Sequence, residues 1–147
     1  PHLHHLPMTA ATALPDDLRT RLVALLERAH CPYSGFPVAV IIGDSRGVRF
    51  EGVNVESAAF PNGSCAEKAA LGAAVTAVGR AALDIDIVWI ATPTEEPTAP
   101  CGSCRQLLSE LAPDARVVSW AVSGDRLHEW AVSELLPDAF DLSSQAP

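Results

Sequence analysis

Two short segments hold three of the chain's four cysteines, and each segment lies at the predicted start of a helix. One is Pro-Cys-Gly-Ser-Cys, with Cys101 and Cys104; the other is Ser-Cys-Ala-Glu-Lys, with Cys65 and Glu67. The free N–H groups and the positive dipole end of a helix stabilise a thiolate there. Side chains of the first turn lean toward the helix N-terminus. Two such helix ends placed together would therefore bring three thiolates onto one metal ion.

The three thiolates predict a zinc site of the catalytic kind. Sulfur ligands suit Zn²⁺, at about 2.3 Å per bond, and three protein ligands leave a fourth position open for water. Water in that position becomes acidic enough to supply hydroxide near neutral pH. Glu67 is two residues from Cys65, and a carboxylate beside such water can take its proton and pass it onward. We therefore expect Cys65, Cys101 and Cys104 to bind zinc, with Glu67 as the acid–base group.

Other interpretations of the cysteines remain open. A Cys-x-x-Cys pair at a helix start is also typical of thioredoxin-like redox sites, but that role leaves Cys65 and Glu67 unexplained. A closed structural zinc site needs a fourth protein ligand, which Cys31 or a histidine would supply. We expect Cys31 to be a small buried residue instead. Glu67 taken alone would be an ordinary first-turn acid.

Hydrophobic periodicity and turn residues predict the elements that must position these groups. Leu18, Leu22, Leu25 and Leu26 recur at helical spacing, and β-branched runs indicate buried strands. The expected helices cover residues 15–30, 65–79 and 101–112, with a short helix within 130–137. The expected strands cover residues 38–43, 48–56, 85–92 and 115–122. Strands alternate with helices after residue 65, which indicates a layered α/β sheet. The three tryptophans, Trp89, Trp120 and Trp130, belong to no motif and are expected to be packing residues.

Composition narrows the class of protein. The chain has 147 residues, 48% of them hydrophobic, which suits one domain with a substantial core. Its formal net charge is −8 and it has no basic stripe, which argues against binding to a nucleic-acid backbone. No apolar run approaches the roughly 18 to 20 residues that span a bilayer. We therefore expect neither a nucleic-acid nor a membrane partner.

The chain ends look like tails around a single domain. We expect a flexible N-terminal tail over residues 1–14, a domain over 15–142 and a C-terminal tail over 143–147. The N-terminal tail holds three histidines, His2, His4 and His5, and we exclude them from the site. It has neither the basic nor the apolar region of a secretory signal. Four cysteines without such a signal indicate a reducing compartment, so we expect a cytoplasmic protein.

Six motifs in order resemble the zinc-dependent cytidine deaminase family, in particular its short three-cysteine members. They are CPYSGFPV (31–38), NVE (54–56), CAE (65–67), PCGSC (100–104), CRQLL (104–108) and LLPDAF (135–140). The family's chemistry uses zinc held by cysteines, with a glutamate two positions after the first ligand. The likeness covers residues 16–142, nearly the whole domain. Several motifs in family order are far more specific than any one of them.

The resemblance implies a fold and a reaction. The fold would be a single-domain, three-layer α/β/α structure with a mixed sheet of about five strands. The reaction would be hydrolytic deamination of cytidine or deoxycytidine to the uridine nucleoside and ammonia, a step of pyrimidine salvage. Glu67 would move protons between water, ring and leaving group.

The resemblance also implies substrate contacts and an assembly. Asn54 and Glu56 would hold the ribose hydroxyls, and backbone groups at Ala66 and Ala99 would read the base. Phe36 would be a pocket wall, although the sequence leaves it equally open as a core residue. The short members of the family look tetrameric, so a homotetramer is expected. Phe60 and Phe140 would then reach a neighbouring subunit's pocket; in a monomer they would cover the chain's own core.

Three positions depart from the family pattern. Lys68 stands where many relatives have an arginine that donates to the thiolates, and lysine lacks that fork of donors. Phe60 stands where tyrosine is common, and Ala39 where glycine is usual. Two alternative functions remain open: a deaminase of another aminopyrimidine nucleoside such as blasticidin S, and a non-catalytic zinc-binding or redox module. Glu56, which blasticidin-type relatives tend to lack, favours the ordinary nucleosides.

Overall fold

The computed structural model of the chain describes residues 13–145. The three N-terminal histidines therefore lie outside the described residues. No helix within that range is long and apolar enough to cross a membrane.

A five-stranded sheet forms the middle of the molecule, with strand order β2-β1-β3-β4-β5. The strands are β1 (Ala39–Asp44), β2 (Arg49–Val53), β3 (Ile85–Thr92), β4 (Arg116–Ala121) and β5 (Arg126–Ala131). Only β3 and β4 pair in parallel; the other neighbours are antiparallel. The prediction of a mixed sheet of about five strands is confirmed.

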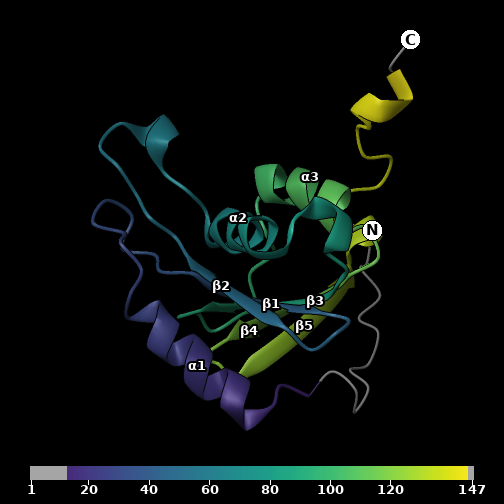
Figure 1. Ribbon diagram of the computed structural model, residues 1–147. Helices are drawn as coiled ribbons and strands as arrows, with labels where there is room; N and C mark the ends of the chain where they lie inside the picture. Colours follow the sequence, from purple (N-terminus) through teal and green to yellow (C-terminus); the bar gives the residue numbers. More distant parts are fainter. Residues whose placement is uncertain (1–12, 146–147) are drawn as a thin grey trace, which may run out of the picture.

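Helices cover both faces of this sheet. Helix α1 (Asp16–Leu26) lies on one face, and α2 (Ala66–Val78) and α3 (Gly102–Leu111) lie side by side on the other (Figure 1). The remaining helical segments are α4 (Val132–Leu135), η2 (Phe60–Asn62), η3 (Arg80–Ala82) and η4 (Leu142–Gln145). The expected three-layer α/β/α arrangement is confirmed.

Two hydrophobic clusters hold the layers together. Leu18 and Leu22 of α1 pack with Trp120 on one face of the sheet, and Leu71 of α2 and Leu108 of α3 belong to the cluster on the other. Because strand side chains alternate between faces, β4 contributes to both clusters. The tryptophans pack as expected: Trp120 is buried, and Trp89 and Trp130 are half-buried against the clusters.

The start of α2 is pressed against strand β2. A Cβ atom on Gly52 would lie 2.4 Å from the backbone nitrogen of Ala70 and 2.5 Å from the carbonyl oxygen of Ala66. Real Cβ atoms do not approach other atoms this closely, so only glycine permits the contact. The close approach fixes the first turn of α2, and with it the neighbouring Cys65.

The structure corrects four sequence predictions. Helix α1 ends at Leu26, earlier than residue 30, and the second strand ends at Val53, earlier than residue 56. In the stretch directly after Val53, Val55 forms only isolated β-bridges, one with His30 and one with Ser64. Strand β5 was not among the strands expected from the sequence pattern. Cys31 is half-buried, where we expected a buried residue.

Candidate metal centre and adjoining pocket

Three thiols converge at the ends of α2 and α3. The sulfur atoms of Cys65, Cys101 and Cys104 all lie within 4.8 Å of one another, and those of Cys65 and Cys101 are 3.9 Å apart. Tetrahedral zinc with bonds of about 2.3 Å places its sulfur ligands about 3.8 Å apart. Within residues 13–145 no fourth ligand atom joins the group. The cluster fits a zinc ion that keeps one position open.

The local backbone explains why the thiols meet. Cys65 is the N-cap residue of α2 and Cys101 is the N-cap residue of α3, both with extended backbone. Cys104 follows in the first turn of α3 and is fully buried. Each cysteine therefore lies at a helix end where N–H groups lack helical partners and favour negative charge.

Glu67 lies buried beside the thiols. Its side chain is in the first turn of α2, the residue is 6% exposed, and its Oε2 accepts a hydrogen bond of 3.4 Å from the thiol of Cys104. Burial raises the pKa of the Glu67 carboxyl above its ordinary value. A carboxyl group with a raised pKa exchanges protons more readily near neutral pH than an exposed one does.

The thiols differ in acidity. Burial raises the pKa of Cys104 far above its usual range, and the nearby charge of Glu67 adds to this effect. Burial likewise raises the pKa of Cys65. Burial also acts on Cys101, but hydrogen bonds from the backbone N–H of Cys104 and from the other two thiols outweigh it and lower the pKa. A metal ion that binds all three as thiolates must displace their protons, and burial opposes this more at Cys65 and Cys104 than at Cys101.

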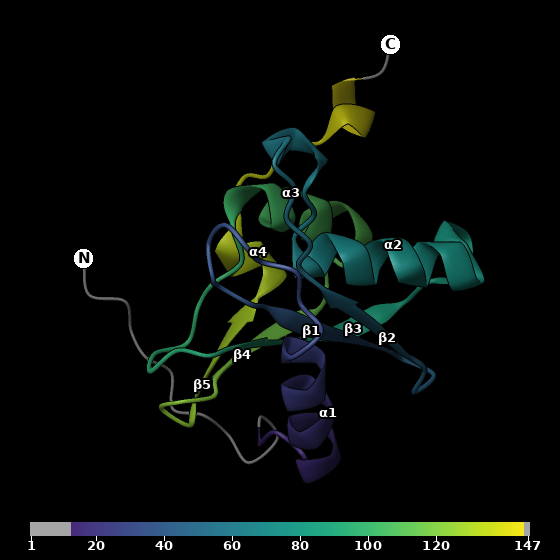
Figure 2. The ribbon, with the colours of Figure 1, turned by 90° about the vertical axis from the view of Figure 1, so that its left-hand side faces the viewer.

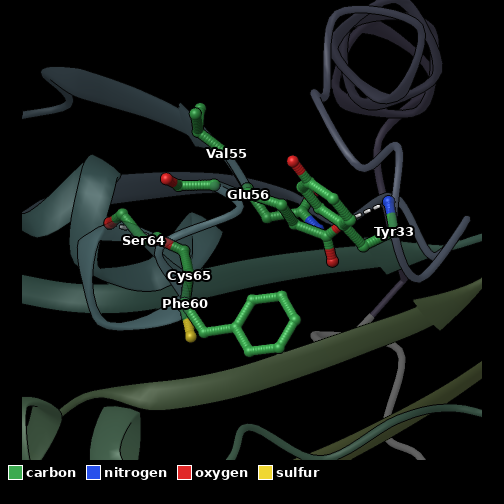
Figure 3. A pocket seen from close by; sticks show the side chains of 9 residues that line it. Tyr33, Val55, Glu56, Phe60, Ser64 and Cys65 are labelled. Carbon is green, nitrogen blue, oxygen red and sulfur yellow. Dashed lines mark hydrogen bonds between the residues drawn. The ribbon is translucent and has the colours of Figure 1, made fainter.

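A pocket of about 330 Å³ opens beside Cys65 (Figure 3). It lies between the segment that follows α1 and the segment that joins β2 to α2. Its lining residues are Tyr33, Asn54, Val55, Glu56, Ser57, Phe60, Gly63, Ser64 and Cys65. The structure thus brings three expected site residues, Asn54, Glu56 and Cys65, to one cavity.

Asn54 and Glu56 hold the segment that precedes β1. Oε1 of Glu56 accepts hydrogen bonds from the backbone N–H groups of Tyr33 and Ser34, at 3.0 and 3.1 Å; Figure 3 shows the bond to Tyr33. Asn54 accepts from the N–H of Val38 and donates to the carbonyl of Phe36, both at 2.8 Å. Hydrogen bonds from the side chain and backbone of Ser34 lower the pKa of Glu56, so this carboxylate is charged at neutral pH.

Two expected substrate residues lie outside the pocket lining. Phe36, which the resemblance assigns to a pocket wall, is not among the residues that line the cavity, and its 38% exposure rules out the alternative of a core residue. Ala66 is fully buried at the start of α2, directly after Cys65. Its contribution to a pocket would come from its backbone.

The pocket contains residues that the sequence did not single out. Tyr33 lies in the motif CPYSGFPV, and Ser64 directly precedes the expected metal ligand Cys65. These positions could have indicated that both residues lie at the site. Ser57 gave no signal. The ring of Tyr33 meets that of Phe60 edge-on, with centroids 5.9 Å apart. Because Phe60 is 76% exposed, this aromatic pair forms the rim of the pocket.

Two cationic side chains close in sequence to the three thiols, Arg105 and Lys68, have different surroundings. Arg105, directly after Cys104, donates to the carbonyl oxygens of Pro100 and Leu135, at 2.8 and 2.9 Å. Lys68, which replaces the usual arginine, is half-buried on α2. The hydrogen bonds of residues 13–145 include none from Lys68 to the three thiols. Arg105 therefore joins the carbonyl group of Pro100, directly before Cys101, to that of Leu135 at the end of α4.

Known proteins share both the sequence and the fold. A cytidine deaminase from Halalkalibacterium halodurans is 38% identical over 115 residues, which cover 78% of this chain and 84% of the relative. One from Mycoplasma pneumoniae is 32% identical, covering 85% and 92% of the two chains. The crystal structure of cytidine deaminase from Burkholderia pseudomallei superimposes with a TM-score of 0.75 at 34% identity, covering 90% of this chain and all of that one.

The family comparison covers the elements that build the metal centre. The family model for the cytidine and deoxycytidylate deaminase zinc-binding region matches residues 15–120. That range begins just before α1 and ends within β4, so it includes the three thiols, Glu67 and all the pocket-lining residues. This chain therefore belongs to the cytidine and deoxycytidylate deaminase zinc-binding family.

Proposed function

We propose that the chain catalyses zinc-dependent hydrolytic deamination of cytidine or deoxycytidine, giving the uridine nucleoside and ammonia. The observation that carries this proposal is the convergence of three thiols and a buried carboxylate beside a pocket that contains Asn54 and Glu56. The relatives named above are cytidine deaminases, and their similarity extends over most of both chains.

Cys65, Cys101 and Cys104 would hold the zinc ion. When bound, zinc lowers the pKa of a water ligand and supplies hydroxide near neutral pH. Glu67 would accept the proton of that water and deliver it to N3 of the cytosine ring. It would then take the proton of the new hydroxyl group at C4 and pass it to the departing amino group, which leaves as ammonia. Burial supports this role, because a carboxyl group whose pKa is raised both takes up and releases protons in the neutral range.

The pocket would orient the nucleoside. Backbone groups around Ala66 and Ala99 would hydrogen-bond the base. Ala66 begins α2, where N–H groups of the first turn lack helical partners, and Ala99 lies in the irregular segment before α3. Glu56 would accept hydrogen bonds from the ribose hydroxyls, and the amide group of Asn54 would donate to or accept from them. One carboxylate oxygen of Glu56 accepts hydrogen bonds from the backbone of Tyr33 and Ser34. The carboxylate that would bind the sugar therefore also fixes the segment that contains Tyr33 at the pocket.

Charge favours a nucleoside over a nucleotide. None of the nine residues that line the pocket, all within the described part of the chain, is a lysine or an arginine. Glu56 adds a negative charge there, and the whole chain carries −8. A phosphate group prefers arginine or lysine as its partner, so a 5′-phosphate or a polynucleotide backbone would meet repulsion in this pocket.

The proposed protein is a cytoplasmic homotetramer of pyrimidine salvage. Phe60, Phe140 and Leu142 are 76%, 63% and 68% exposed. They lie in or beside η2 and η4, which project past the layer formed by α2 and α3 in both views (Figures 1 and 2). Exposed apolar groups on projecting segments are typical of surfaces that pack against another subunit. A monomer in which Phe60 and Phe140 cover their own core is at odds with these exposures.

One experiment tests the proposal and separates its alternatives. Purified protein is analysed for zinc, and ammonia release and absorbance change are followed with cytidine, deoxycytidine, deoxycytidine monophosphate, cytosine and blasticidin S. We expect one zinc per chain and turnover of the two nucleosides far above the others. Metal-stripped protein and Glu67→Gln are the controls. Preferred turnover of blasticidin S would make it the substrate in place of cytidine. Bound zinc without ammonia release from any of the compounds would overturn the proposal that the protein is an enzyme.

A further inference from the structure

The segment between β3 and α3 carries Cys101 to the metal centre, yet it has no regular secondary structure. It leaves β3 at Thr92 and enters α3 at Gly102. An irregular segment holds a side chain in place only if its backbone is anchored elsewhere. The anchors of this segment therefore decide how well the third thiol is positioned.

One hydroxyl group anchors the segment close to its end. Ser119, on β4, is 0% exposed. Its Oγ donates to the carbonyl oxygen of Thr98 at 2.8 Å and accepts from the backbone N–H of the same residue at 3.1 Å. A single side chain thus satisfies both backbone groups of Thr98, as a neighbouring strand would otherwise do.

Further contacts hold the start of the segment. The N–H of Gly124 donates to the carbonyl of Thr94 at 3.2 Å, and the hydroxyl groups of Thr92 and Thr94 are 2.7 Å apart. The hydroxyl of Thr98 lies 3.4 Å from that of Thr92. These bonds join the segment to itself and to the turn before β5, while Ser119 joins its later part to the sheet.

The distance in sequence from this anchor to the metal centre is short. Only Ala99 and Pro100 lie between Thr98 and Cys101. Proline fixes its own φ angle and restricts the residue before it, so this linker is stiff. A shift of the Thr98 backbone is therefore passed on to Cys101 and to the carbonyl group of Ala99.

We propose that Ser119 is a positioning residue for the metal centre, acting through the backbone of Thr98 on Cys101 and Ala99. The residue is not among those that line the pocket and is not one of the three thiols. Its effect on zinc retention stands on the geometry alone, whereas its effect on turnover rests on the proposed function. Residues that orient metal ligands typically change metal affinity or activity 10- to 100-fold when they are replaced.

The test compares Ser119→Ala with Val118→Ala. Val118 is the preceding residue of β4 and is also buried, and its side chain points to the opposite face of the sheet. Both changes remove buried groups and lower stability, but only the first removes the bonds to Thr98. Zinc-loaded proteins are mixed with excess chelator and the release rate is recorded, followed by kcat and KM for cytidine. Ser119→Thr is the rescue variant, since it keeps the hydroxyl group.

We expect Ser119→Ala to release zinc at least ~10-fold faster than wild type and to lose activity mainly in kcat, while Val118→Ala and Ser119→Thr stay near wild type. Equal release rates in the two alanine variants would overturn the proposal, because Ser119 would then be a structural residue only. If Ser119→Ala does not fold, Ser119→Cys, a weak donor and acceptor, should give an intermediate rate; a wild-type rate would again overturn it. Wild type without deaminase activity would overturn the proposed function and leave the zinc-release comparison intact.

Discussion

The thiol of Cys104 donates a hydrogen bond to the carboxylate of Glu67, 3.4 Å away, where both residues are buried. The proposed metal ligand on α3 and the proposed acid–base group on α2 are thus in direct contact. A thiolate cannot donate this bond, so Cys104 would release Glu67 to bond a water molecule or a substrate when it loses its proton on binding a metal ion. The contact places the carboxylate at the metal centre before any substrate arrives.

Glu67→Gln should keep the fold and the zinc but lose nearly all deamination. Glutamine has the same size and can still accept from Cys104, but it cannot carry a proton. General acid–base groups contribute roughly 10²- to 10⁴-fold to a rate, and this residue would serve in several steps. Steady-state kinetics with cytidine and zinc analysis measure the two effects. Glu110→Gln, exposed on α3, is the control, and near-normal turnover of Glu67→Gln would remove the residue from the mechanism.

Cys101→Ala and Cys104→Ala should each lose zinc or bind it far more weakly. The reason is that the described residues offer three thiols and no fourth ligand atom in the cluster, so each loss leaves only two. Cys31→Ala is the matched control, because Cys31 is a free thiol outside the cluster. Metal analysis after dialysis is the measurement. Loss of zinc from Cys31→Ala would instead indicate a closed, structural site.

Glu56→Ala should raise KM for cytidine much more than it affects the poor substrate cytosine, which has no sugar. A buried site that hydrogen-bonds a hydroxyl group is left with unpaired groups when that contact is lost. The change also frees the N–H groups of Tyr33 and Ser34. Glu56→Gln separates the two effects, because its carbonyl oxygen can still accept from both. Unchanged cytidine kinetics in both variants would leave Glu56 without a role in sugar binding.

Phe140→Ala should weaken assembly and activity together. The carbonyl group of Phe140 accepts a hydrogen bond from Gln106 of α3 at 2.9 Å, while the residue itself is 63% exposed. The ring is therefore not packed into the chain's own core. Light scattering should give four times the chain mass of 15.5 kDa for wild type and smaller species for the variant. Val48→Ala, exposed in the β1–β2 turn, is the control; a fully active wild-type monomer would contradict the tetramer.

Acid should weaken the contact between α1 and β2. Hydrogen bonds from Arg21 to both oxygens of Glu51 lower the pKa of Glu51 below its ordinary value. The stability that this pair contributes is therefore complete above the unfolded-state pKa and is lost as pH falls through the lower folded-state value. The pair is partly exposed, so solvent screens the interaction and the effect is small. Glu51→Gln should lower Tm at pH 7 and reduce its acid dependence; equal Tm–pH curves would contradict this.

The metal centre was predictable because its signals are local. Cysteines at two helix starts, with Glu67 two positions after the first, indicate a zinc site from a few residues alone. The direction of side chains at helix N-termini explains why the three thiols meet. Strand β5 lacked such a signal. Its residues are exposed or half-buried, since an edge strand pairs on one side only, and its pairing with β4 depends on contacts outside its own pattern.

Other features depend on partners far along the chain. The second strand ends early because Val55 bridges to His30 and Ser64, and neither pairing is visible in the local alternation of residues. Ser119 reads as one more residue of a buried strand, and its partner Thr98 is 21 residues away. Asn54 was expected to bind a sugar, yet its amide group also holds Val38 and Phe36. Such contacts follow from tertiary packing, which periodicity does not report.

Two of the thiols that meet at the metal centre come from distant parts of the chain. Cys65 and Cys101 are 36 residues apart, and the chain between them contains all of α2 and β3. A zinc ion held by both acts as a crosslink, because it closes a long loop and restricts the unfolded chain. It also binds the folded state in preference to the unfolded one. The lifetime of the folded protein against heat and proteases should therefore follow the supply of zinc in the cell.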